Sequence, residues 1–125
     1  MQRRQFIHSA AAAAVASSLS GLSMAQDTSR PLRIVVPFPA GGPTDMVPRN
    51  MQDVLPKLLG GQAVVIENKA GAGGSIGMAE VARATDGVTF GIATLSTHGV
   101  NPAVFKKLPY DATNDFVGVT EIVKA

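Results

Sequence analysis

Short apolar runs alternate with segments of helical spacing from residue 30 onward. Leu32 to Val36 and Ala63 to Ile66 are apolar on both faces, which is typical of parallel strands covered by helices. Thr44 is the expected N-cap of the helix between them, and Pro56 is expected to kink or end that helix. The helical spacing of the apolar residues predicts one buried stripe, formed by Val47, Met51, Val54 and Leu58.

The alternation continues toward the end of the chain. Ser75 to Ala84 is predicted to form a short helix and Val88 to Ala93 a third strand. A polar turn at Thr94 to Asn101 is expected to lead into a short helix over Pro102 to Lys107. Phe116 to Val123 reads as a fourth strand. Strands and helices joined by short links predict an α/β fold, with a parallel sheet flanked by helices.

Two glycine turns follow the first two strands. Ala40, Gly41 and Gly42 carry almost no side chain, so a ligand can approach the main chain closely there. The next helix adds first-turn N–H groups that lack intrahelical partners, and such groups attract anions. Asp45 in that turn suits the helix dipole. The second turn, Gly71 to Ser75, has the same design, so the two turns predict a binding site built mainly from main chain.

Residues 1–25 have the features of an export signal. Arg3 and Arg4 form a basic start, Phe6 to Ala16 is apolar, and small residues at Ser23 and Ala25 suit cleavage ahead of residue 26. The apolar run is shorter than the roughly 20 residues that span a bilayer. The arginine pair followed by an apolar pair also fits a twin-arginine signal, with an ordinary Sec signal as the alternative.

Charge and composition exclude several classes of function. Cleavage after residue 25 would remove two of the eleven basic residues and none of the nine acidic ones, which leaves a neutral chain. A neutral chain without a basic run has no electrostatic footprint for nucleic acid. The absence of cysteine excludes thiolate catalysis and cysteine-ligated metals. No acidic or histidine cluster indicates a metal site, and no cofactor is expected.

Three segments stand out together: Pro37 to Asp45, Glu67 to Gly77 and Thr97 to Pro102. They resemble the Bug family, also called the TctC family, of periplasmic solute-binding receptors of tripartite tricarboxylate transporters. The resemblance covers nearly all of residues 30 to 125, with departures at Ala70 and Gly118, where the family usually has proline. It implies that residues 26–125 form the N-terminal part of lobe 1 of a two-lobe protein with the type II periplasmic-binding fold, here incomplete.

The resemblance also implies a function without catalysis. The protein would be periplasmic and monomeric at full length, with its signal cleaved near Ala25. It would pass a small organic carboxylate to the membrane components of a tripartite transporter; di- and tricarboxylates, acidic amino acids and aromatic acids remain open. Family ligand contacts carry over to Phe38, Ala40, Gly41, Thr44 and Asp45 in the first loop, Gly73, Gly74 and Ser75 in the second, and Ser96, Thr97 and Asn101 in the third.

A secreted serine esterase is the alternative. Gly73 to Gly77 satisfies the G-x-S-x-G pattern, with Ser75 as nucleophile, His98 as base, and Asp86 or Asp111 as the third member. An elbow serine follows its strand directly, whereas several residues separate this one from its strand, which argues against the triad. The glycines also hint at a dinucleotide site, but the next strand ends without an acidic residue to hold a ribose.

Overall fold

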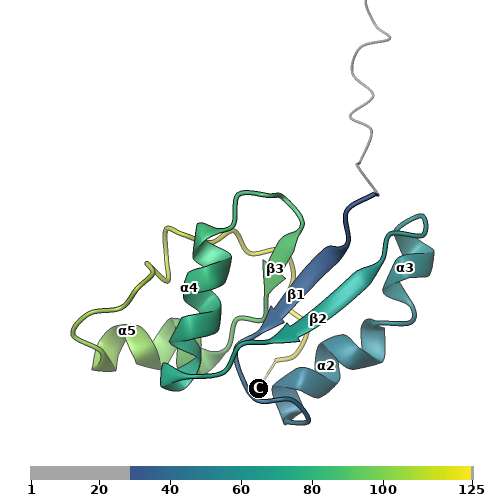
Figure 1. Cartoon of the computed structure of the whole chain (residues 1–125). Coiled ribbons are helices and arrows are strands. Elements are labelled where there is room, and N and C mark those ends of the chain that lie inside the picture. Colours follow the sequence, from purple (N-terminus) through teal and green to yellow (C-terminus); the bar gives the residue numbers. More distant parts are fainter. Residues whose placement is uncertain (1–28, 125) are drawn as a thin grey trace, which may run out of the picture.

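The computed structural model describes residues 29–124, so the predicted export signal and its cleavage point lie outside the described residues. Three strands form one parallel sheet in the order β2-β1-β3 (Figure 1), with β1 at Leu32–Val36, β2 at Val64–Asn68 and β3 at Thr89–Gly91. Ile34 in the central strand pairs with Ile66 on one side and Phe90 on the other. The predicted parallel α/β sheet is therefore confirmed.

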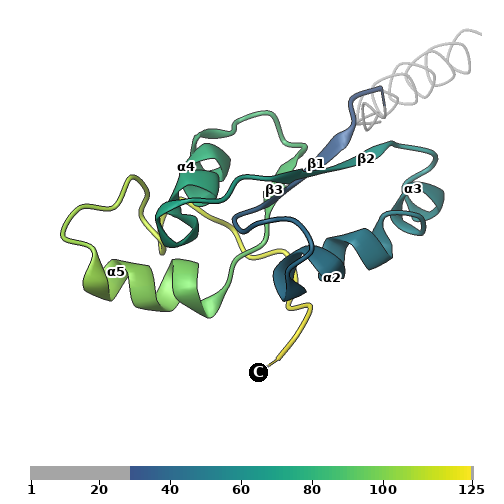
Figure 2. The same cartoon turned by 60° about the horizontal axis from the view of Figure 1, so that its bottom comes forward.

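Helices lie on both faces of this sheet. They are α2 (Pro43–Met51), α3 (Leu55–Leu58), the 3-10 turn η1 (Ala72–Gly74), α4 (Ser75–Arg83), the π-helical turn η2 (Ser96–Val100) and α5 (Asn101–Val104). Figure 2 shows α4 on one side of the strands and α2 with α3 on the other. Between residues 29 and 124, no helix is long and apolar enough to cross a membrane.

The core forms where β1 is covered from both sides. Val35 and Val36 are fully buried, and Ile34 is nearly so. On the α4 side, Met78 and Ala79 pack with Tyr110, a residue from the irregular segment after α5. The central strand and the helix after the second glycine turn therefore hold the sheet and the late part of the chain together.

The region after the first glycine turn differs from the prediction in detail. The N-cap is Gly42 and the helix starts at Pro43, so Thr44 lies inside the first turn. Proline is favoured at that position because its φ is already helical and its missing N–H has no partner to lose. The helix breaks before α3, which turns Val54 and Leu58 outward with 51% and 75% of their surface exposed, so the predicted stripe is wrong at these two positions.

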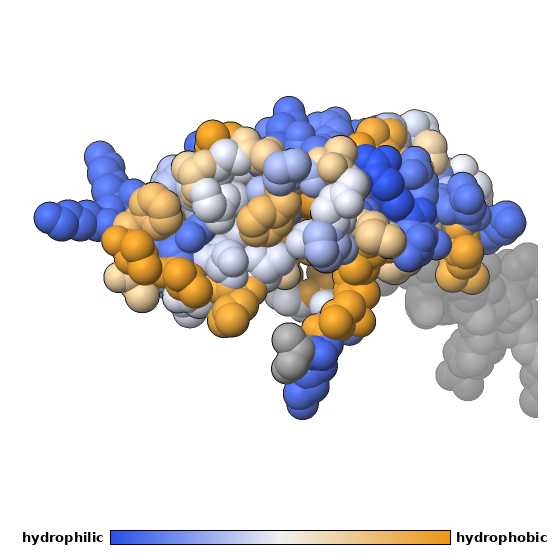
Figure 3. Space-filling view, turned by 90° about the horizontal axis from the view of Figure 1, so that it is seen from below, coloured by the Kyte–Doolittle hydropathy of each residue, from blue (hydrophilic) through white to orange (hydrophobic). Residues whose placement is uncertain are grey.

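Two predictions for the last third of the chain are also wrong. Thr94 to Asn101, expected as a polar turn, contains the π-helical turn that continues directly into α5, which ends at Val104 rather than Lys107. Phe116 to Val123 forms no strand in the described part of the chain, because no neighbouring strand offers it backbone hydrogen bonds. Val117 and Val119 are 90% and 73% exposed, and Figure 3 shows the chain end projecting with apolar residues along it.

Candidate functional site

The first two loops meet where the central strand ends. Pro37, directly after β1, is buried against Gly74 of the second loop and Gly77 in the first turn of α4. A Cβ placed on Gly74 would lie 3.2 Å from the Pro37 Cβ, and one placed on Gly77 would lie 3.1 Å from the Pro37 Cα. Only glycine allows this approach. The start of the first loop and the second glycine turn are thus held side by side at the carboxyl edge, where open α/β sheets bind their ligands.

The third loop packs against the second. A Cβ on Gly74 would lie only 2.8 Å from the Thr97 Cγ2, so the threonine methyl fills the space that a side chain would need. The Asn101 Nδ2 donates a hydrogen bond of 2.8 Å to the Gly73 carbonyl. All three predicted segments therefore come together, through Pro37 and Gly74 on one side and through Gly73, Thr97 and Asn101 on the other.

A buried carboxylate organises the first loop. Asp45 is 1% exposed, and its Oδ2 accepts hydrogen bonds from the Arg49 Nε at 2.7 Å and from the Gly41 amide at 2.8 Å. Its Oδ1 accepts a third bond from the Asn68 Nδ2 at 2.9 Å. The arginine, followed by the amide and asparagine bonds, lowers the pKa of Asp45 to about 2. Asp45 is therefore an ionised anchor of the loop.

Asn68 and Arg49 were not predicted as site residues. Asn68, the last residue of β2, also donates to the Phe38 carbonyl at 3.1 Å and accepts a bond of 2.9 Å from the Arg49 Nη2. The i,i+4 spacing of Asp45 and Arg49 was a signal for their ion pair. No local pattern pointed to Asn68, whose role depends on the strand bringing it beside the first loop.

The second loop depends on left-handed backbone. Gly73 and Gly74 have φ of +64° and +88°, values that residues other than glycine rarely adopt. The Gly74 amide closes the turn on the Gly71 carbonyl at 2.9 Å, and the Ser75 hydroxyl donates to the Ala72 carbonyl at 2.6 Å. The turn leads directly into the first turn of α4, whose amides face the carboxyl edge.

The predicted ligand residues divide into two groups by exposure. Phe38, Ala40, Gly41, Thr44, Gly73 and Ser96 are exposed or half-buried, whereas Asp45, Gly74, Ser75, Thr97 and Asn101 are buried. Every polar side chain of the buried group makes a hydrogen bond to another part of the protein. Asp45 and Asn101 link their loops to neighbouring segments, whereas Ser75 and Thr97 bond within their own loops. Because these polar side chains already have partners, the surface offered to a ligand is largely main chain.

The geometry does not support the esterase triad. The Ser75 hydroxyl is bonded to its own turn, while the His98 Nδ1 lies 2.9 Å from the Thr97 Oγ1. Asp86 accepts bonds from the Val88 and Thr89 amides where β3 begins, at the opposite end of the sheet. Asp111 accepts bonds within its own turn, from the backbone amides of residues 113 and 114. The serine, histidine and aspartate side chains thus have separate partners. Within residues 29–124, no three histidine or acidic side chains gather as they would for a metal ion.

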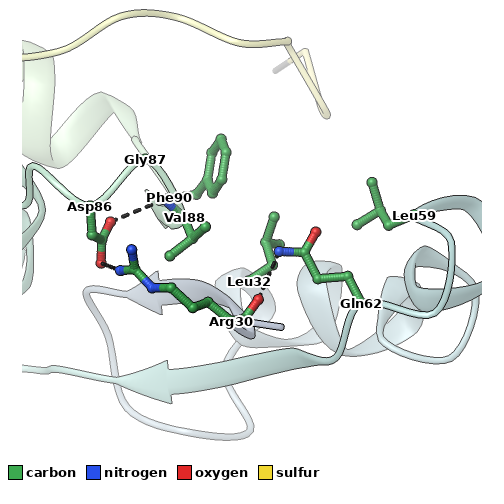
Figure 4. Close-up of a pocket in the computed structure, with 8 residues that line it drawn as sticks. All are labelled: Arg30, Leu32, Leu59, Gln62, Asp86, Gly87, Val88 and Phe90. Carbon is green, nitrogen blue, oxygen red and sulfur yellow. Dashed lines mark hydrogen bonds and ion pairs between the residues drawn. The ribbon is translucent and has the colours of Figure 1, made fainter. Parts of the chain in front are cut away.

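A hollow of about 340 Å³ lies at the amino edge of the sheet, away from the glycine turns. Figure 4 shows Arg30 reaching across it to Asp86, at 3.6 Å, while the Gln62 side chain donates to the Arg30 carbonyl. Leu59 and Phe90 line its apolar part. Its charged groups pair with each other, and parallel sheets bind ligands at the carboxyl edge instead, so the candidate site remains at the three loops.

Comparison with known proteins identifies the family. The profile of the "Tripartite tricarboxylate transporter family receptor" (TctC) matches residues 47–125. Protein BugT of Bordetella pertussis is 38% identical over 96 residues, which cover 75% of this chain and 29% of that protein. A protein encoded in the TAR-I ttuE-ttuC' intergenic region of Agrobacterium vitis is 40% identical over 112 residues, covering 83% of this chain and 30% of its own length.

Solved structures agree with this assignment. Periplasmic binding protein BugD matches with 42% identity and a TM-score of 0.64, over 70% of this chain and 29% of that one. MatC from Rhodopseudomonas palustris, solved with bound malate, matches with 45% identity and a TM-score of 0.65, over 70% and 30%. The chain thus spans about 30% of the length of these relatives, has the fold of periplasmic binding proteins, and is related to receptors rather than enzymes. It belongs to the TctC family of tripartite tricarboxylate transporter receptors.

Proposed function

We propose that this chain is the N-terminal part of the first lobe of an exported, monomeric, two-lobed receptor that binds a small organic carboxylate. The carboxylate would sit at the carboxyl edge of the sheet, between the three loops, and would be held by main-chain N–H groups and bridging waters. The observation that carries the proposal is the packing of Pro37, at the start of the first loop, on Gly74 of the second, with each loop leading into the first turn of a helix.

Main-chain groups can supply useful binding energy at such a place. A helix N-terminus stabilises a nearby anion by about 0.3–1 kcal/mol, and by up to ~2 kcal/mol when the site is partly buried. The first turns of α2 and α4 provide two such ends. The Thr44 amide lies in the first of them, whereas the Ser75 amide in the second already donates to the Ala72 carbonyl. Together they favour an anion without requiring any charged side chain.

The nearest basic side chains are engaged elsewhere. Arg49 bonds Asp45 and Asn68 behind the first loop. Lys69 lies 3.5 Å from a Glu80 oxygen and 3.7 Å from a Glu67 oxygen on the α4 side of the sheet. Neither forms an ionic clamp from this lobe, which supports recognition by main chain.

The family suggests where such a receptor works. The matching profile describes receptors of tripartite transporters, and the solved relative BugD is a periplasmic binding protein. The proposed receptor is therefore periplasmic, with a signal cleaved near Ala25, and hands its carboxylate to the membrane components of the transporter. Dicarboxylates such as malate, which is bound in MatC, are one candidate ligand class. Tricarboxylates, acidic amino acids and aromatic acids are the others.

A ligand panel tests the proposal on the complete receptor, meaning this chain together with the remainder of the two-lobed protein. Malate, citrate, glutamate and benzoate are each added while the melting temperature is recorded. A receptor gains stability by mass action, so at least one acid is expected to raise the melting temperature without being consumed. No shift with any of these acids would overturn the proposed function.

Matched leucine variants test the position of the site. Gly41 and Gly87 both have positive φ, +82° and +71°, and a Cβ on either meets nothing within 4 Å. Gly41 lies in the first glycine turn, whereas Gly87 lies at the amino edge. Gly41→Leu is expected to abolish binding of the acid found in the panel by filling the space above the loop, and Gly87→Leu is expected to retain it. Equal affinities in the two variants would place the ligand elsewhere.

A further inference from the structure

The π-helical turn before α5 leaves one backbone carbonyl without its regular partner. In a π-helix the carbonyl of each residue accepts a bond from the amide five residues later. The Asn101 amide follows this rule and donates to the Ser96 carbonyl. The next carbonyl, that of Thr97, would need the amide of residue 102, which is proline and has no N–H. Thr97 is fully buried, so its carbonyl needs another donor.

Tyr110 supplies that donor. Tyr110 is 6% exposed. Its hydroxyl donates a hydrogen bond of 2.5 Å to the carbonyl of Thr97, which lies thirteen residues earlier in the sequence. The ring is fixed by the Phe116 ring, 5.6 Å away and nearly perpendicular, and it lies 6.1 Å from the His98 ring. The hydroxyl is therefore aimed at the carbonyl by packing, so it can hold the turn in one position.

The carbonyl that Tyr110 holds belongs to the residue that packs on the second glycine turn. The Thr97 methyl occupies the space beside Gly74, and Asn101, one turn further on, bonds the Gly73 carbonyl. A shift of the π-helical turn would move both contacts at once. Because geometry at a binding site must be held closely, a supporting bond just behind the loop affects affinity as well as stability.

We propose that Tyr110 is a positioning residue for the carboxylate site: its hydroxyl replaces the missing proline N–H and thereby fixes the turn that supports Gly73 and Gly74. This inference rests on the proposed carboxylate-binding function. Tyr110 lies outside the three loops that carry the family resemblance, and it would act on the ligand only through Thr97 and Asn101.

The test is Tyr110→Phe in the complete receptor, with the acid that raises the wild-type melting temperature most among malate, citrate, glutamate and benzoate. The variant keeps the ring contacts with Phe116 and His98 and removes only the hydroxyl. Titration calorimetry is expected to give an affinity about tenfold lower, which corresponds to roughly 1.4 kcal/mol. Amide hydrogen exchange is expected to become faster across residues 71–77 and 96–101.

Val64→Ala is the control for a general loss of stability. Val64 is 8% exposed in β2 and pairs with Leu32, far from the three loops, so its truncation lowers the melting temperature without touching the turn. Affinity and exchange at residues 71–77 are expected to stay at wild-type values. If Tyr110→Phe loses no more affinity than Val64→Ala, the positioning role is wrong while the receptor function stands. If the wild type binds none of the acids, the proposed function itself fails.

Discussion

Replacing Gly74 with alanine should destabilise the protein through two separable effects. Gly74 has a φ of +88°, and its missing Cβ leaves room for the Thr97 methyl and for Pro37. Alanine in a left-handed conformation costs roughly 1–2 kcal/mol because its Cβ crowds the following carbonyl. In addition, the new Cβ would lie 2.8 Å from the Thr97 Cγ2 and 3.3 Å from the Pro37 carbonyl oxygen.

The second effect is overpacking between two elements that cannot both move. A contact of 2.8 Å between carbon atoms is far inside the usual separation of 3.5–4.0 Å. Because Pro37 is fixed at the end of the central strand, relief must come from the third loop. Inserting a methyl group into a closed site of this kind costs about 1–3 kcal/mol, so the total for Gly74→Ala is about 2–5 kcal/mol.

Gly61 separates the two effects. Its φ of +91° nearly equals that of Gly74, but a Cβ at Gly61 meets nothing within 4 Å. Gly61→Ala should therefore lower the free energy of unfolding only through the backbone effect, by about 1–2 kcal/mol. Urea unfolding of both variants of the complete receptor measures the difference, which should be about 1–3 kcal/mol. Equal losses of unfolding free energy in the two variants would mean that Thr97 moves aside at no cost. The close packing of the loops would then not contribute to stability.

Two further predictions concern acidity and export. Because the folded pKa of Asp45, about 2, is below its ordinary 3.8, its stabilising contribution is complete above about pH 4 and disappears as the pH falls toward 2. The urea midpoint should therefore fall over this window in the wild type and less steeply in Asp45→Asn; parallel curves would contradict the anchoring role. If export uses the twin-arginine route, changing Arg3 and Arg4 to lysine should leave precursor in the cytoplasm, and normal export of the double mutant would exclude that route.

The strands and glycine turns could be predicted because their signals are local. Leu32 to Val36 is apolar throughout, and positive φ at Gly73 and Gly74 follows from the demands of a tight turn. Phe116 to Val123 shows the limit of such signals. Its residues favour a strand, but a strand exists only when a neighbour accepts its hydrogen bonds, and within residues 29–124 no strand lies beside it. Propensity alone could not reveal that.

The helical turn at Ser96–Val100 was missed for a related reason. Thr97, Gly99 and Val100 have low helix propensity. The proline that follows at position 102 removes one amide from the hydrogen-bond ladder of the turn. Thr97 stabilises the turn locally, since its hydroxyl accepts a hydrogen bond of 2.9 Å from the Thr94 amide. Tyr110 stabilises it from outside the turn, by donating to the Thr97 carbonyl. A contact between residues so far apart in sequence leaves no periodic pattern to read.

The same limit applies to the roles of the polar site residues. Sequence resemblance selected Asp45, Ser75 and Asn101, but only the fold shows that each is bonded to the protein, with Asn68 bonding Asp45 from 23 residues away. Side chains used in this way cannot distinguish one acid from another. In the proposed function, the first turns of α2 and α4 would offer main-chain N–H groups, which recognise a carboxylate group and little else. In the proposed receptor, selection among acids would therefore depend on the exposed positions around the turns, such as Phe38 and Ser96, and on the part of the receptor that faces them.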